Sequence, residues 1–388
     1  EGDILSAQKI NNSRRNLLDS GAYNLLDFTY PPMGSPVSPD APQPVELDIR
    51  LREPKPFRLD YGLTYDTERG VGVITDISTI NTLGEARVLG LRSVVDRQRQ
   101  EYRLYFTQPF LGRKRINTTG QLFAIRDHPA NTGLETLETG IALQQFVRFG
   151  PRFTFTYGYR HAYADFLSDA RGENYSGRTA PLTSTLTRDT RDNALDATKG
   201  SFISNAFEYA PRFLGGNINY YRYYFQGFKY FGLTQPSFMP FEGDQKRSHT
   251  VFATGMRFGI ANTLHDRSYL PFARFFAGGG TTIRGYSQNS IGPAFEDGTP
   301  AGGRATFVFN NELRFPLYKW LDGVGFLDAG NVWESPSDMR VNDLRAGTGF
   351  GLRIRNPFVV IRLDYGIKLG RRPGESIGGF FFSIGQAF

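Results

Sequence analysis

The sequence feature that most constrains the fold is a two-residue alternation of apolar and polar side chains, which runs from Phe57 to the end of the chain. In residues 57–66, FRLDYGLTYD, aromatic and aliphatic side chains occupy the odd positions and polar residues or glycine the even ones. Successive side chains of a β-strand point to opposite faces, so the pattern predicts strands with one apolar and one polar face.

About sixteen such segments follow one another, each roughly as long as a transmembrane β-strand, and an even number suits a closed antiparallel barrel. The predicted strands are 57–66, 70–79, 84–96, 99–109, 114–127, 134–148, 151–165, 180–191, 200–212, 217–233, 248–261, 302–316, 321–334, 343–355, 357–369 and 378–388.

Composition separates a membrane barrel from other all-β folds. The mean hydropathy of -0.38 and the absence of an apolar run of about 18 residues argue against a transmembrane helix. A transmembrane barrel strand also averages to a polar hydropathy, because lipid-facing and lumen-facing residues alternate. A soluble β-propeller or sandwich has many short strands too. Rows of aromatic residues on one face favour an all-β, 16-stranded antiparallel transmembrane barrel over residues 54–388.

The connections between the predicted strands differ in length. Short ones such as 355–357 alternate with long polar ones at 165–180, 234–247 and 262–301. Short periplasmic turns and long outer loops are typical of outer-membrane barrels. We therefore expect the three long connections at the outer end.

The N-terminal residues 1–53 have a different pattern. Residues 4–23 predict one helix, with Ser6 as a possible N-cap. The alternating segments 25–30 and 45–51 predict two strands. This helix and these strands form a separate α+β unit before the barrel.

Several classes of function are excluded by what the sequence lacks. It has no cysteine, which excludes a disulfide framework, a thiolate metal site and a cysteine nucleophile. The net charge is +7, but the arginines are distributed singly along the strands and form no basic stripe, which argues against nucleic-acid binding. No pair of carboxylates stands out, and the histidines lack metal-ligand spacing. We expect no enzyme activity, cofactor or metal. The histidines are His128, His161, His249 and His265.

The glycine-rich stretch at 274–293, RFFAGGGTTIRGYSQNSIGP, has some features of a nucleotide-binding loop but lacks others. Gly280 and Gly285 have the spacing of a phosphate-binding loop, but Tyr286 stands where the lysine is needed. A dinucleotide-binding fingerprint that starts at Gly278 would need a glycine at position 283, where this sequence has Ile283. Both kinds of nucleotide site are excluded.

Four segments together resemble the BamA and TamA superfamily of outer-membrane assembly proteins. They are AGGGTTIRGY at 277–286, NNELRFPL at 310–317, FLDAGNVW at 326–333 and the terminal FSIGQAF at 382–388. The resemblance covers essentially the whole chain. It implies that residues 1–53 are the C-terminal part of a POTRA domain, the periplasmic module that precedes the barrel.

The resemblance also implies that the tip of loop 262–301 folds back into the lumen, where its arginine binds acidic groups of the barrel wall. Strand parity places Glu312 and Asp328 on the lumen face, so we assign Arg284 to these two carboxylates. The predicted loop clasp is Ile283, Arg284, Gly285, Tyr286, Glu312 and Asp328, reached through a glycine turn at Gly278, Gly279 and Gly280.

The seam between the first and last barrel strands is the expected working part, because a weakly paired edge can accept an incoming strand. Glycines loosen the last strand, and its final aromatic residue resembles the sorting signal of outer-membrane barrels. The predicted seam residues are Phe57, Leu59, Tyr61, Leu63, Gly378, Gly379, Phe380, Phe382, Gly385 and Phe388.

The function implied by the resemblance is folding and insertion of other β-barrel proteins into the bacterial outer membrane, with the N-terminal part in the periplasm. Implied partners are unfolded β-barrel clients, outer-membrane lipids or lipopolysaccharide, periplasmic chaperones and accessory lipoproteins. A two-partner-type secretion pore and a passive channel remain alternatives. The sequence does not separate a BamA-like role from a TamA-like one.

Overall fold

The computed structural model describes most of the chain. The described residues are 6–19, 21, 23, 25–29, 31, 46–53, 55–112, 114, 116–168, 175–194, 196–233, 250–264, 273–318, 320–355 and 360–384.

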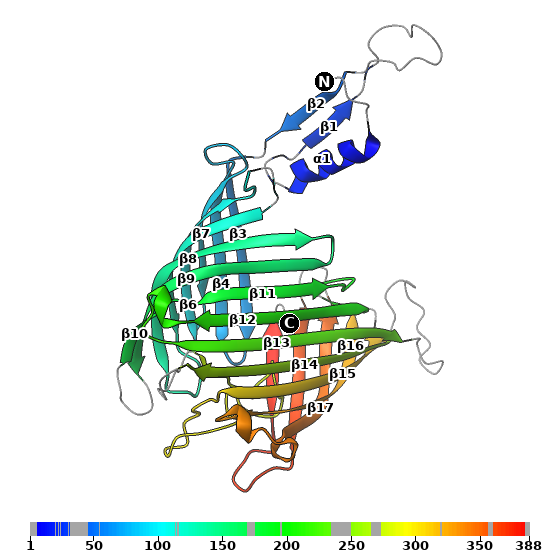
Figure 1. Cartoon of the computed structure of the whole chain (residues 1–388). Coiled ribbons are helices and arrows are strands. Elements are labelled where there is room, and N and C mark those ends of the chain that lie inside the picture. The colour runs from blue at the N-terminus through cyan, green and yellow to red at the C-terminus, as the bar shows by residue number, and fades with distance from the viewer. Residues whose placement is uncertain are drawn as a thin grey trace.

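Most of these residues form one closed antiparallel barrel in which each strand pairs with its neighbours in sequence (Figure 1). Its strands are β3 (Phe57–Asp66), β4 (Gly70–Ile80), β5 (Val88–Val95), β6 (Arg99–Gln108), β7 (Ile116–Asp127), β8 (Glu135–Phe149), β9 (Phe153–Ser168), β10 (Tyr175–Thr179), β11 (Leu182–Asp189), β12 (Gly200–Ala210), β13 (Tyr220–Leu233), β14 (Thr250–Thr263), β15 (Ala305–Tyr318), β16 (Leu321–Trp333), β17 (Arg345–Arg355), β18 (Val360–Leu369) and β19 (Gly378–Ile384). Short 3-10 helices cover Arg212–Leu214, Pro336–Asp338 and Val341–Asp343.

The barrel has sixteen strand positions. β10 pairs with the second half of β9, and β11 pairs with the first half of β9. β10 and β11 therefore share one position, and the seventeen strands β3 to β19 occupy sixteen positions. Pro181, which separates β10 from β11, has no backbone N–H to donate to a ladder. The predicted 16-stranded antiparallel barrel is confirmed.

The two faces of the barrel wall differ as the alternation predicts. Leu122, Ile141 and Leu143 are among many apolar side chains more than half exposed on the outside. A soluble protein rarely exposes so large an apolar surface, whereas lipid would cover it. The inner face carries ion pairs such as Arg99 with Asp127, whose closest nitrogen–oxygen distance is 2.8 Å.

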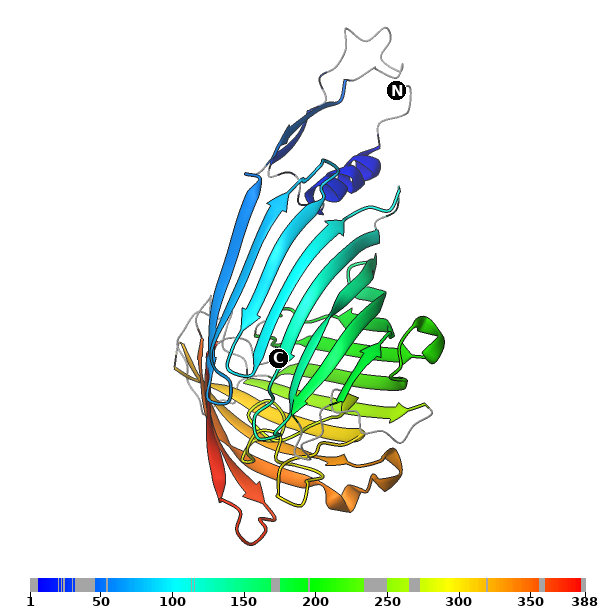
Figure 2. The ribbon, with the colours of Figure 1, turned by 90° about the vertical axis from the view of Figure 1, so that its left-hand side faces the viewer.

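The N-terminal unit consists of α1 (Ala7–Asp19) and an antiparallel pair of strands, β1 (Leu25–Thr29) and β2 (Asp48–Arg52). The Ser6 hydroxyl accepts a hydrogen bond from the Lys9 N–H at 3.5 Å, the position expected for an N-cap. Figure 2 shows this unit beyond the end of the barrel at which β3 begins. Among the described residues, no helix is both long and apolar enough to cross a membrane.

Strand direction corrects one prediction about the loops. The connections 168–175 and 263–305 lie at the end opposite to the N-terminal unit, as expected for outer loops. β13 fills the tenth position, so it ends, and β14 begins, on the side of the N-terminal unit. The prediction that 234–247 is an outer loop was therefore wrong. Loop length alone does not show at which end of an antiparallel barrel a connection falls.

The join between β19 and β3 is much less paired than the other joins in the described part of the barrel. It has two residue pairs, Ser383 with Asp66 and Ile384 with Tyr65, whereas β3 and β4 share ten. One more hydrogen bond runs from the Thr67 N–H to the Phe382 carbonyl at 3.0 Å. In Figure 2, the described part of the C-terminal strands (red) meets β3 (blue) near the lower end of β3.

The register of the seam can be tested by cross-linking, because the sequence has no cysteine. Tyr65→Cys combined with Ile384→Cys should form a disulfide, since directly paired strand residues have Cα separations that a disulfide can span. The control Tyr61→Cys with Ile384→Cys places the thiols about 13 Å further apart along the strand. Equal cross-linking of both pairs on a non-reducing gel would contradict this register.

Candidate functional site

The candidate site begins with the connection between β14 and β15, whose described residues are 264 and 273–304. Gly278 and Gly279 have φ angles of 107° and 101°, a region that side chains disfavour. The Gly278 N–H donates to the Thr282 hydroxyl at 2.9 Å, and the Gly279 N–H donates to the Tyr286 carbonyl at 3.0 Å. These bonds close a tight loop that presents Arg284 to the barrel wall.

Arg284 is 3% exposed and contacts acidic side chains of the barrel wall. Its Nε and Nη2 donate to the two carboxylate oxygens of Asp328 on β16, at 2.7 and 2.9 Å. Its Nη1 donates to Oε1 of Glu312 on β15 at 2.6 Å. The guanidinium also lies 3.5 Å from the centre of the Phe326 ring. Both carboxylates that parity had assigned to Arg284 are thus its hydrogen-bond acceptors.

The structure adds charged residues that the sequence argument did not assign to the loop. Asp364 of β18 lies 3.4 Å from Nη1 of Arg284 and accepts hydrogen bonds from Arg353 of β17 at 2.6 and 3.0 Å. Arg314 donates to Glu312 at 3.0 Å, and Arg362 lies 3.8 Å from it. We call these seven residues the arginine network: Arg284, Glu312, Arg314, Asp328, Arg353, Arg362 and Asp364.

A signal for this network was present in the sequence. Arg362 and Asp364 are two residues apart on the polar face of one strand, which places both in the lumen. The sequence does not show at what height each strand pairs with the next, so it cannot bring them to Arg284.

The loop tip also depends on glycines of the barrel wall. A Cβ on Gly347 would collide with the Arg284 carbonyl, and one on Gly366 would collide with the backbone of Gly285. Gly285 itself has a φ of 99°. Gly347 and Gly366 therefore let the loop backbone lie directly against β17 and β18. Sequence reasoning had found no role for them.

The other residues of the predicted clasp secure the tip. Ile283 is fully buried in a cluster with Val308 and Val332 of the barrel wall. The Tyr286 hydroxyl donates to the Ala346 carbonyl at 3.2 Å. These apolar and polar contacts hold the loop on the C-terminal strands.

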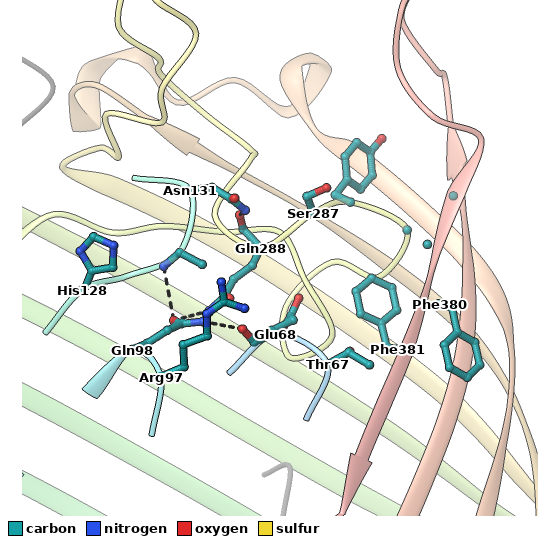
Figure 3. Close-up of a pocket in the computed structure, with 15 residues that line it drawn as sticks. Thr67, Glu68, Arg97, Gln98, His128, Asn131, Ser287, Gln288, Phe380 and Phe381 are labelled. Atoms are coloured by element: carbon teal, nitrogen blue, oxygen red, sulfur yellow. Dashed lines mark hydrogen bonds between the residues drawn. The ribbon is translucent and has the colours of Figure 1, made fainter. Parts of the chain in front are cut away.

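On its other side the loop meets the turns of the N-terminal strands, around a cavity of about 500 Å³ (Figure 3). The Gly280 N–H donates to Oε1 of Glu68, in the turn after β3, at 3.1 Å. The side-chain amides of Gln98 and Gln288 bond each other at 2.8 and 3.1 Å. The loop therefore contacts both sides of the seam.

The predicted seam residues lie on two separate edges. Phe57, Leu59, Tyr61 and Leu63 of β3 are 60–80% exposed, and β3 from Phe57 to Thr64 has no seam partner in the described part of β19. Gly378, Gly379 and Phe380 line the cavity of Figure 3, and the Phe382 ring centre lies 5.5 Å from that of Tyr65. Gly385 and Phe388 lie outside the described residues.

A closed sixteen-position barrel with an apolar exterior, a charged lumen and a long loop folded inside defines a transmembrane β-barrel of the outer-membrane class. Residues 81–388 match the family model of the Omp85 superfamily domain. The chain belongs to the Omp85 superfamily, which confirms the resemblance found in the sequence.

Relatives and solved structures agree with this family. The chain is 24% identical over its whole length to the outer membrane protein assembly factor BamA of Nitratidesulfovibrio vulgaris, of which it covers 48%. A SAM50-like protein of Schizosaccharomyces pombe is 34% identical over 36% of the chain and 27% of its own length. The structure of Haemophilus ducreyi BamA lacking POTRA domains 1–3 superposes with a TM-score of 0.80 at 17% identity, covering 100% of this chain and 79% of the other. The chain spans about half the length of the BamA relatives that it matches.

Removing Arg284 should destabilise the barrel. Arg284→Ala leaves Asp328 buried beside Glu312 and Asp364 without its bidentate partner, and breaking such a pair typically costs about 3–5 kcal/mol. Arg284→Lys should recover only part of this, because an ammonium lacks the planar fork. Urea unfolding measures the loss. The control Arg97→Ala removes an exposed cation from a turn, and an equal loss in both variants would refute the special role of Arg284.

Glu68 gives the loop contact a pH dependence. Burial, assisted by Asp66, raises the pKa of Glu68 to about 7, although the Gly280 N–H and Arg69 oppose the shift. A raised folded-state pKa means that the buried site favours the protonated carboxyl in the folded state, so stability should fall as pH rises from about 4.5 through 7. Melting temperatures between pH 5 and 8 should show this fall. Glu68→Gln should flatten the difference, whereas parallel profiles for the two proteins would contradict it.

Proposed function

We propose that the chain folds and inserts other β-barrel proteins into the outer membrane of a bacterium. The observation that carries this proposal is the two-pair seam, which leaves the edge of β3 from Phe57 to Thr64 without a described partner. The N–H and C=O groups on the edge of a barrel strand can pair with an added strand where no neighbouring strand holds them. A client strand leaving the periplasm would find its first hydrogen-bond partners there.

The physical driving force is backbone pairing in lipid. An unpaired N–H or C=O in the hydrocarbon region costs several kcal/mol, because no water is present to satisfy it. A strand that adds to β3 removes this cost from both edges. The client then adds strand after strand and separates once its own first and last strands pair.

The comparisons support this function at the level of the family. Two relatives aligned over nearly the whole chain are named outer membrane protein assembly factor BamA, and the SAM50-like protein is similar to 36% of the chain. Because the chain spans about half of those BamA proteins, its activity and partners are proposed here rather than transferred.

We assign the N-terminal unit to the end of a POTRA domain that lies in the periplasm. One helix against a two-stranded antiparallel sheet fits the last part of that module. Three apolar side chains in and beside β2 are 40–44% exposed, which suits docking of an extended segment: Leu47, Ile49 and Leu51. Unfolded clients, periplasmic chaperones and accessory lipoproteins are the proposed partners on this side, and lipids with lipopolysaccharide surround the barrel.

The arginine network has a supporting role in this proposal. It joins the lumen loop to β15, β16, β17 and β18, so that the C-terminal side of the seam moves as one body. The apposed edge of β3 is then the part that adapts to a client.

A secretion pore is the second candidate, because the barrel also superposes on CdiB from Acinetobacter baumannii with a TM-score of 0.58 at 12% identity, over 99% of this chain and 68% of the other. Transport of a soluble protein through the lumen would require the loop to leave it. The buried contacts of Arg284 oppose that movement, and they also oppose a permanently open passive channel.

Reconstitution in liposomes tests the proposed function. A urea-denatured eight-stranded outer-membrane barrel should fold several times faster when the chain is present in the bilayer, measured by the gel shift of its folded form. Oxidising the Tyr65→Cys, Ile384→Cys pair should abolish the acceleration, and a reductant should restore it. The singly substituted proteins control for the cysteines themselves. Unchanged client folding in all samples would reject the insertion function.

A further inference from the structure

The lumen loop reaches both sides of the seam, and it does so with two kinds of contact. Towards the C-terminal strands, Arg284 makes charge-assisted bonds to Glu312 and Asp328. Towards the N-terminal strands, the contacts are mostly those of neutral side-chain amides around Gln98 and Gln288. Strand pairing across the same gap amounts to two residue pairs among the described residues.

Gln98 is the centre of the N-terminal contacts. It is 8% exposed, and its side-chain amide joins three segments that are distant in sequence. Its Nε2 donates to Oε1 of Gln288 at 2.8 Å and to the Glu68 carbonyl at 2.9 Å. Its Oε1 accepts from Nε2 of Gln288 at 3.1 Å and from the Ala130 N–H at 3.4 Å. Figure 3 shows this junction beside the first residues of β19.

Hydrogen bonds to the backbone carbonyl of Gln288, and from its neighbour Asn289, hold Gln288 at this position. Its carbonyl accepts a hydrogen bond from Nδ2 of Asn131, in the turn between β7 and β8, at 3.0 Å. The next residue, Asn289, has a φ of 62° and donates from Nδ2 to the Ala130 carbonyl at 2.9 Å. The loop is thus tied to the turns after β3, β5 and β7.

These ties all lie at one end of the seam. Glu68, Gln98 and Ala130 belong to turns at the end opposite to the N-terminal unit, and the two paired residues of β3 are the last two of that strand. Residues Phe57–Thr64 of β3 lie towards the other end, and none of them pairs with a described residue of β19. Among the described residues, the ties across the seam are therefore all at its outer end.

We propose that Gln98 and Gln288 are positioning residues that clamp the outer end of the seam, so that the seam opens from its periplasmic end only. This inference rests on the proposed insertion function, for which it assigns the direction of opening. A client strand would pair along Phe57 to Thr64 while the clamp keeps the outer turns of β3 and β5 against the loop.

The clamp consists of hydrogen bonds between neutral amides, which are strong enough to hold the contact but can be broken reversibly. Hydrogen bonds between neutral amides are roughly half as strong as those in which one partner is charged. If the two sides of the seam separate completely, the amide bonds to Gln98 should break before the bonds of Arg284. The loop then stays with the C-terminal strands.

Distances across the seam test the clamp without any client. The cysteine-free chain allows spin labels at Val71→Cys and Ile377→Cys, two exposed positions on either side of the outer end, and at Tyr61→Cys and Leu363→Cys towards the inner end. We expect a narrow outer distance distribution and a broad inner one. Gln98→Ala or Gln288→Ala should raise the ratio of separated to closed outer ends about tenfold, as expected when more than one hydrogen bond is lost.

Two variants make the test specific. Gln100→Ala, whose exposed side chain lies two residues further along the chain, should leave both distributions unchanged. Gln98→Glu combined with Gln288→Lys replaces the amide pair by an ion pair and should restore the narrow outer distribution. It should also restore client folding rates, which we expect to fall several-fold in the single alanine variants.

The outcomes separate the clamp from the proposed function. Unchanged outer distances in the alanine variants would overturn the clamp, whatever the folding rates. Wider outer distances with unchanged folding rates would overturn the positioning role. If the unmodified chain fails to accelerate client folding, the insertion function fails, while the distances still decide whether the clamp exists.

Discussion

The structure depends on the need of every backbone N–H and C=O in a bilayer to find a partner within the protein. A closed antiparallel barrel meets this need strand by strand, and fifteen of the sixteen strand positions join their successor through an extended ladder. The sixteenth join has two residue pairs among the described residues. It is the least paired join in the described part of the wall, and we propose it as the place where a client strand is added.

The lumen loop connects the two sides of the seam, where few strand-to-strand hydrogen bonds are described. Arg284 fixes the loop to the C-terminal strands through buried carboxylates, and Gln98 connects it to the turns of the N-terminal strands. Glycines at 347 and 366 make the contact possible by letting two backbones meet. A loop inside the barrel can thereby hold the outer end of the seam.

Much of the fold followed from the sequence, because alternation depends only on neighbouring residues. The period-2 pattern located the strand positions to within a few residues, and parity placed Glu312 and Asp328 on the face where Arg284 lies. It missed β10, which forms within the predicted connection 165–180. The side of connection 234–247 was misjudged, because loop length carries no information on strand direction. Asp364 and Arg353 were not assigned to the network, because the sequence of one strand does not determine the register in which it pairs with the next.

By itself the sequence determined a transmembrane barrel with a polar lumen, an arginine carried by a glycine-rich loop, and the carboxylates able to receive it. Those properties are local, since each is set by side-chain chemistry and by which face of a strand a residue occupies. Tertiary structure alone decided that the seam is paired at its outer end, that Gln98 meets Gln288, and that four arginines share three carboxylates. These contacts join residues far apart in the chain, and they arise only when the tilt and stagger of all the strands bring them to one height.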